Sequence, residues 1–195
     1  MPHKSHDHKL GDFENSSRIG AWFYSLFSSF YGRTLYAKQR EYSDLKGKES
    51  VLDFGSGPGH VSERIIDYIT PDGRLTCLDV SKEFLKICRK KLKNYSNVTF
   101  LFGDIRNLEI PPNTYDLIYI NFVLHHVNEE IRMEIADKIV DILKPGGKII
   151  IIEFPGKNHG LTEEKLEELF RSDKIEGNLR FENKSGIIYQ LIKHS

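Results

Sequence analysis

Short apolar runs alternate with helix-like stretches through the middle of this 195-residue chain. Continuous runs of Val, Ile and Leu predict strands that are covered on both faces, whereas apolar residues spaced by three and four predict helices. The predicted strands are residues 51–54, 74–80, 98–102, 117–122 and 148–154, and the predicted helices are residues 60–68, 81–95 and 129–143. This alternation is typical of a parallel sheet with crossover helices.

Further regions flank this alternation on both sides. Residues 162–170 have helical spacing, and residues 179–182 and 186–192 predict a hairpin that closes the edge of the sheet. Residues 17–38 are rich in aromatic residues and predict one helix, or two broken at Gly32, and residues 1–16 predict a flexible polar tail. We therefore predict an α/β fold: a doubly wound, mostly parallel seven-stranded sheet with helices on both faces and a C-terminal antiparallel hairpin.

Composition narrows the class of protein. The chain has 28 Lys and Arg against 28 Asp and Glu, so no overall charge attracts it to nucleic acid or to an anionic membrane. No apolar run approaches the roughly 20 residues that span a bilayer, and the first residues lack the apolar segment of a secretory signal. Two cysteines within predicted apolar elements indicate buried free thiols in a reducing compartment. We expect a cytoplasmic protein.

Three glycines follow the first predicted strand and open the next helix: Gly55, Gly57 and Gly59. Glycine at such a turn lets the backbone bend tightly and approach a ligand, with helix N–H groups facing it. The G-x-G-x-G spacing is one residue shorter than the G-x-G-x-x-G of dinucleotide-binding proteins, which disfavours a pyrophosphate-bearing cofactor. The structural alternative is a strand-to-helix turn that needs glycine for its backbone alone.

Polar residues end the strands that follow. Asp79 closes the second strand about 20 residues after the glycines, the distance at which such folds place a carboxylate on a ribose diol. Asp104 ends the third strand, and Asn121 and Phe122 end the fourth. We expect these residues to meet in the crevice where open α/β sheets bind ligands, although a helix N-cap or turn is the alternative for each aspartate.

Five segments resemble, in the same order, the motifs of class I S-adenosylmethionine (SAM)-dependent methyltransferases. They are residues 51–59 (VLDFGSGPG), 78–81 (LDVS), 103–105 (GDI), 124–127 (LHHV) and 143–147 (LKPGG). The resemblance covers roughly residues 46–154, over half of the chain. The resemblance is to the small-molecule, ubiquinone/menaquinone-biosynthesis-like group, and it implies a SAM-binding domain over residues 46–195 with residues 17–45 as an aromatic helical lid.

The resemblance also implies a role for each matching residue. The residues implied to bind SAM are Asp53, Gly55, Ser56, Gly57, Gly59, Asp79, Val80, Asp104, Ile105, Asn121 and Phe122. The glycine loop would hold the methionine portion and contact the ribose, and Asp79 would accept from both ribose hydroxyls. Asp104 and the backbone N–H of Ile105 would bind the adenine ring, with the fourth strand end near the sulfonium.

The side of the site that faces the methyl acceptor is less defined by the motifs. Methyl transfer from a sulfonium is an in-line displacement, so the protein mainly has to position the nucleophile and exclude water. A base is needed only where the acceptor must lose a proton. His126 is the better candidate of the pair His125 and His126, with a structural histidine as the alternative. Tyr31, in the implied lid, is a second candidate, with lid packing as the alternative.

We therefore expect SAM-dependent methyl transfer to a small-molecule acceptor. The fourth strand is not followed by the Asn/Asp-Pro-Pro-aromatic sequence of adenine or glutamine methyltransferases, and no Pro-Cys pair or basic extension suggests a nucleic-acid substrate. The His-rich tail predicts disorder rather than a metal site, and no metal is expected. The alternatives are a catalytically inactive SAM-binding partner or regulator, and an RNA methyltransferase.

Overall fold

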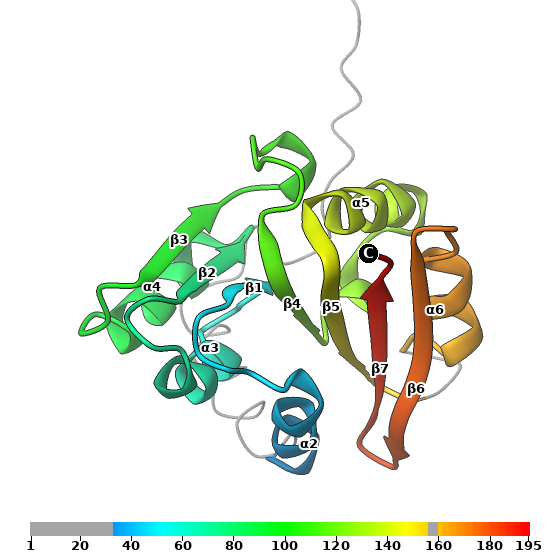
Figure 1. The fold of residues 1–195 in the computed structure, drawn as a ribbon, viewed down its shortest axis with the longest axis horizontal. Helices are drawn as coiled ribbons and strands as arrows, with labels where there is room; N and C mark the ends of the chain where they lie inside the picture. Colours follow the sequence, from blue (N-terminus) through cyan, green and yellow to red (C-terminus); the bar gives the residue numbers. More distant parts are fainter. Residues whose placement is uncertain (1–32, 156–159) are drawn as a thin grey trace, which may run out of the picture.

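The computed structural model describes residues 33–155 and 160–195 (Figure 1). The predicted tail and the first part of the aromatic segment, Tyr31 included, lie outside these residues.

Within the described residues, seven strands form one sheet of order β3-β2-β1-β4-β5-β7-β6 (Figure 1). Strands β1 to β5 pair in parallel, and β7 runs antiparallel to both β5 and β6. The predicted mostly parallel sheet with a C-terminal antiparallel hairpin is therefore confirmed. The strands are β1 (Ser50–Phe54), β2 (Arg74–Asp79), β3 (Val98–Phe102), β4 (Tyr115–Asn121), β5 (Leu143–Glu153), β6 (Ile175–Asn183) and β7 (Gly186–Lys193).

Helices cover both faces of the sheet and enclose two apolar layers (Figure 1). One layer lies under α2 (Arg33–Ser43), α3 (His60–Ile65) and α4 (Lys82–Lys91), and the other under α5 (Glu129–Ile142) and α6 (Glu163–Leu169). The isoleucines of β5 alternate between these layers, as the two-residue period of a strand requires. Short 3₁₀ helices follow three elements: η2 (Ile66–Tyr68), η3 (Ile105–Asn107) and η4 (Leu124–His126).

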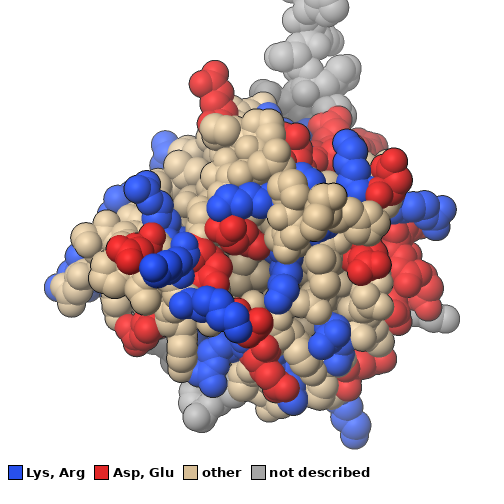
Figure 2. Space-filling view, viewed as in Figure 1, with Lys and Arg blue, Asp and Glu red and all other residues tan. Residues whose placement is uncertain are grey.

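Charged side chains of both signs are interspersed on the molecular face shown in Figure 2. This arrangement agrees with the equal numbers of acidic and basic residues in the chain. Among the described residues, no helix is long and apolar enough to cross a membrane.

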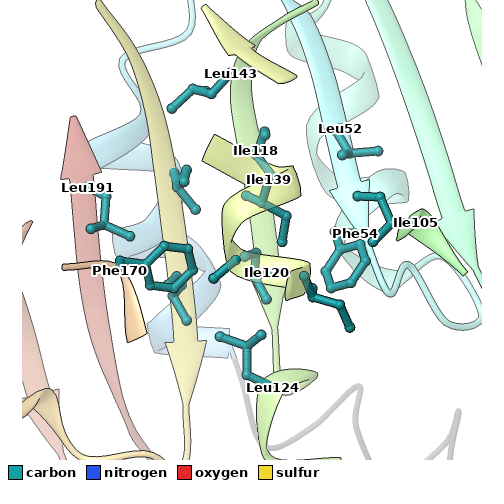
Figure 3. Close-up of a cluster of buried hydrophobic side chains, with 14 of the residues drawn as sticks. Leu52, Phe54, Ile105, Ile118, Ile120, Leu124, Ile139, Leu143, Phe170 and Leu191 are labelled. Carbon is teal, nitrogen blue, oxygen red and sulfur yellow. The ribbon is translucent and has the colours of Figure 1, made fainter. Parts of the chain in front are cut away.

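The layer under α5 is built from branched aliphatic side chains. Ile139 of α5 lies beside Ile118 and Ile120 of β4 (Figure 3), and all three side chains are fully buried. Asn128 caps the N-terminus of α5, and its side chain accepts a hydrogen bond from the backbone N–H of Glu130. The glutamates of its first turn also favour the positive end of the helix dipole.

Several elements differ from the prediction in their bounds; for example, α4 ends at Lys91 rather than at residue 95. Strand β5 begins at Leu143 rather than at residue 148, because Leu143 pairs with Tyr115 across an irregularity in register that absorbs the Pro-Gly-Gly sequence. Strand β6 extends well beyond the predicted residues 179–182, because its pairing with β7 holds polar residues in the strand. The α-helix predicted over residues 60–68 ends at Ile65, and the 3₁₀ helix η2 follows it.

Candidate active site

A pocket opens at the carboxyl ends of β1, β2, β3 and β4, with an empty volume of about 1100 Å³ that includes its open mouth. Its lining includes most of the residues implied to bind the cofactor, together with His126: Asp53, Gly55, Ser56, Gly57, Asp79, Val80, Asp104, Ile105, Asn121 and Phe122. The strand register explains this meeting, because Phe54 lies opposite both Leu78 and Ile120. The next residues of the three strands, Gly55, Asp79 and Asn121, therefore continue as one row across the sheet.

The glycine loop between β1 and α3 needs two of its glycines for different reasons. Gly55 and Gly57 have φ of 68° and 52°, in the left-handed region that side chains disfavour. A Cβ on Gly55 would lie 2.4 Å from Cγ2 of Val123, so the loop packs directly against the turn after β4. A Cβ on Gly57 would meet no atom within 4 Å. The loop therefore leaves open space above Gly57, where a ligand can approach the backbone.

Gly59 is the one residue of the implied cofactor set that does not line the pocket. A Cβ at this position would lie 2.7 Å from Sγ of Cys88. Gly59 is the N-cap of α3, and its small size lets this end of the helix approach α4. Its position is therefore explained by packing beneath the loop.

Asp79 joins the end of β2 to the glycine loop. Its Oδ2 accepts from the backbone N–H of Gly57 at 2.7 Å, and its Oδ1 accepts from the N–H of Ser81 at 2.7 Å. The residue is only 7% exposed, and burial raises the pKa of its carboxyl to about 6, although these backbone hydrogen bonds oppose the shift. Because each carboxylate oxygen has two lone pairs, the backbone N–H groups of Gly57, Val80 and Ser81 do not use all of the acceptor capacity of the carboxylate. Its two adjacent oxygens suit a vicinal diol.

Asp53 lies deeper, at 1% exposure, under the same loop. Its Oδ2 accepts from Oγ of Ser62 in α3 at 2.6 Å. Burial raises the pKa of the Asp53 carboxyl to about 7; the charge of Asp79 adds to the rise and the Ser62 hydroxyl opposes it. The pocket therefore holds two carboxyl groups that titrate close to neutral pH.

Asp104 has a partner that the sequence did not reveal. Its Oδ2 accepts from Nε and Nη2 of Arg106 at 2.9 and 2.5 Å, and its Oδ1 accepts from the backbone N–H of Arg106 at 3.0 Å. The hydrogen bonds that Arg106 donates to Asp104 raise the pKa of the guanidinium, which also donates to Glu134 at 2.9 Å. The Oδ2 atom is therefore saturated, and Oδ1 keeps one site for a further donor.

The end of β4 carries two unusual features. Phe122 has φ of 55°, a conformation that is costly for a bulky residue and is found most often at functional sites. Its N–H donates to the carbonyl oxygen of Ile152 at 2.8 Å, and its ring centroid lies 4.6 Å from that of Phe154. Beside it, the Nδ2 atom of Asn121 is buried and has no hydrogen-bond partner among the described residues.

The Oγ atom of Ser56 is likewise buried without a hydrogen-bond partner among the described residues. A buried donor that lacks a partner costs roughly 1–3 kcal/mol, so native structures rarely keep one without a ligand or water. Ser56 and Asn121 both line the pocket. The two unpaired groups, the diol-like acceptor pair of Asp79 and the space above Gly57 fit an adenosyl amino acid.

The two histidines after β4 have different surroundings. Nδ1 of His125 lies 2.6 Å from Oε2 of Glu153, whose fully buried carboxylate also accepts from the N–H of Leu124 at 2.9 Å. His126 lines the pocket, with its ring centroid 3.9 Å from that of His125. Burial, followed by the proximity of His125, lowers the pKa of His126 to about 4. His126 is therefore neutral at physiological pH.

Glu153 is a site residue that sequence reasoning missed. It stands at the end of β5 and holds the turn that carries both histidines. The available signal was an acidic residue that ends a continuous run of isoleucines. No group of three or more His, Cys, Asp or Glu residues within the described ranges is arranged to hold a metal ion.

Comparisons with known proteins place the chain in a family. A family model described as a methyltransferase domain matches residues 51–147. The ubiquinone/menaquinone biosynthesis C-methyltransferase UbiE of Wigglesworthia glossinidia brevipalpis is 33% identical over 109 residues, which are 54% of this chain and 43% of that protein. The chain spans about half the length of the curated relatives it matches.

Solved structures share the fold at low sequence identity. A SAM-dependent methyltransferase from Aquifex aeolicus superposes with a TM-score of 0.74 at 18% identity, over 91% of this chain and 98% of that one. The N-methyltransferase NodS from Bradyrhizobium japonicum WM9, solved with S-adenosylhomocysteine (SAH), gives a TM-score of 0.71 at 18% identity, over 88% and 91% of the two chains. With the sheet order, the glycine loop and the family model, these findings show that the chain belongs to the class I, Rossmann-like SAM-dependent methyltransferases.

Proposed function

We propose that the protein transfers the methyl group of SAM to a small-molecule acceptor. The observation that carries the proposal is the row of Gly55, Asp79 and Asn121 at one edge of the sheet, which combines paired acceptors with an unpaired donor. The same pocket is open above Gly57.

The residues present fit the parts of SAM in order. Asp79 accepts from the two ribose hydroxyls with its free lone pairs, and Oδ1 of Asp104 accepts from the adenine amino group. Ile105 is the first residue of η3, where backbone N–H groups lack an intrahelical partner. Its N–H donates to the adenine ring. The glycine loop and Ser56 face the amino-acid portion.

When bound, SAM supplies a methyl group on a positively charged sulfonium. The chain has to align the acceptor with that methyl group and to exclude water. Apolar side chains that include Phe122, Val123 and Val127 line the pocket and serve the second purpose. His126 is neutral at neutral pH and can accept a proton, but a pKa of about 4 makes it a weak base, so we propose for it an orienting role before a proton-abstracting one.

A small acceptor is favoured over RNA by the charges of the protein. The described lining contains no Lys or Arg, and the face in Figure 2 mixes both signs of charge. RNA-binding surfaces instead gather basic residues to neutralise phosphates. The relative named above is a C-methyltransferase and the similar structure is an N-methyltransferase, so the family does not fix the atom that is methylated.

The cytoplasm is the compartment we propose for this activity. Cys77 and Cys88 are both buried and free, which suits a reducing environment.

Calorimetry with SAH, followed by transfer of radiolabelled methyl from SAM to a cell extract, tests the proposal. We expect SAH to bind and the label to enter the low-molecular-mass fraction, and Asp79→Ala to abolish the labelling. SAH binding without any labelling would instead indicate a regulatory SAM-binding protein. Label in RNA, with binding that weakens steeply as salt rises, would indicate an RNA methyltransferase.

A further inference from the structure

Helix α2 contacts β4 through one buried and one partly buried polar contact. Oγ of Ser43 lies 2.5 Å from the hydroxyl of Tyr119, and Nε2 of Gln39 donates to Oδ1 of Asn121 at 2.6 Å. The helix residues are four apart, which spans about 6 Å, and the strand residues are two apart, which spans about 7 Å. The two spacings match, so the two contacts lie one after the other along the helix and the strand. Tyr36, one turn before Gln39, lines the pocket.

The contact from Gln39 decides which group Asn121 offers to the pocket. An amide side chain has an oxygen that accepts and a nitrogen that donates. Because the oxygen of Asn121 is bonded to Gln39, its nitrogen is the free group, and this atom is buried without a partner among the described residues. Gln39 itself is 2% exposed and does not line the pocket.

A hydrogen-bond donor at this position suits an oxygen atom of the ligand and does not suit a positively charged group of the ligand. SAM and SAH end in an amino-acid tail with a carboxylate, and the described lining has no Lys or Arg to meet it. Among the described residues, the neutral donors of the lining that lack a partner are Ser56 Oγ and Asn121 Nδ2, and both suit a carboxylate. We propose that Gln39 is a positioning residue: it turns the Asn121 amide so that Nδ2 donates to the carboxylate of the cofactor. This inference rests on the proposed function.

The test uses two variants that place an oxygen, instead of the nitrogen of Asn121, toward the pocket. In Gln39→Glu, the carboxylate form of the new side chain can only accept, so Asn121 turns its nitrogen toward α2 and presents its oxygen to the pocket. Asn121→Asp presents an oxygen directly. The control is Ser43→Ala, which removes the contact with the hydroxyl of Tyr119 and does not alter Asn121. SAH and 5′-methylthioadenosine, which lacks the amino-acid tail, are titrated into each variant by calorimetry, and thermal melts report folding.

We expect Gln39→Glu and Asn121→Asp to weaken SAH binding about tenfold or more and 5′-methylthioadenosine binding less than about threefold. Ser43→Ala should change both affinities by the same small factor. Equal losses for the two ligands, or a Ser43→Ala variant that matches Gln39→Glu, would overturn the inference. If Gln39→Glu does not fold, wild-type affinity in Asn121→Asp overturns it equally. Failure of the wild type to bind SAH would instead overturn the proposed function.

Discussion

Alanine at Gly55 and at Gly57 should have separable effects, because the two glycines share a backbone conformation and differ in their surroundings. Either substitution places a side chain in the left-handed region, which costs about 1–2 kcal/mol. At Gly55 the new Cβ also meets both methyl groups of Val123, at 2.4 and 2.9 Å, and such overpacking adds about 1–3 kcal/mol. We therefore expect Gly55→Ala to lower the free energy of unfolding by about 2–5 kcal/mol and Gly57→Ala by about 1–2 kcal/mol.

Urea denaturation of the free protein, followed by far-ultraviolet circular dichroism, measures these losses. Val123→Ala removes the two methyl groups, so Gly55→Ala made in that background should cost about as much as Gly57→Ala. Calorimetry should show the opposite order for the ligand: Gly57→Ala, the more stable variant, loses SAH affinity because its methyl group occupies the space above the loop. Equal destabilisation by the two alanines, or no relief from Val123→Ala, would refute the packing argument.

Three further predictions follow from the pocket and the core. SAH affinity should fall as the pH drops below about 6, because the carboxylate form of Asp79 is lost there, and Asp79→Asn should flatten this part of the profile; an unchanged profile in the variant would exclude Asp79 as the titrating group. Glu153→Ala should lower the free energy of unfolding by about 2–4 kcal/mol, since it leaves the N–H of Leu124 and the ring of His125 unpaired, whereas a loss below about 0.5 kcal/mol would show that water replaces the carboxylate. Ile139→Ala should cost about 2–5 kcal/mol in urea denaturation while the folded variant binds SAH as the wild type does, and a weakened affinity would link the α5 layer to the site.

The architecture was readable from the sequence where a single strand or helix carries its own signal. The continuous isoleucine run of β5 predicted a strand covered on both faces, and the packing of these isoleucines into both apolar layers confirms this. The predicted start of the same strand, residue 148, was wrong. The prediction placed it after Pro145 and the two glycines because such residues normally end a helix or strand. There the pairing of Leu143 with Tyr115 overrides local preference.

The candidate site was readable where a residue ends a strand. Asp79 and Asn121 line the pocket because strand ends in a parallel sheet meet at one edge, which spacing alone predicts. The partners that orient such groups were not readable. Gln39 lies 82 residues before Asn121, and Glu153 lies 28 residues after His125, so no local period connects them.

Gly59 is a residue for which the sequence motif and the structure give different explanations. Its place in the glycine motif implied cofactor binding, while the structure explains it by the approach of α3 to Cys88. A motif records which residues occur together and does not distinguish contact with a ligand from packing beneath it.

A crystal structure of the protein with SAH tests the central claim most directly. The account predicts the two ribose hydroxyls on the carboxylate of Asp79, the adenine ring beside Asp104, and the amino-acid tail above Gly57. Crystals grown in saturating SAH whose pocket stays empty, or which hold the ligand elsewhere, would contradict it.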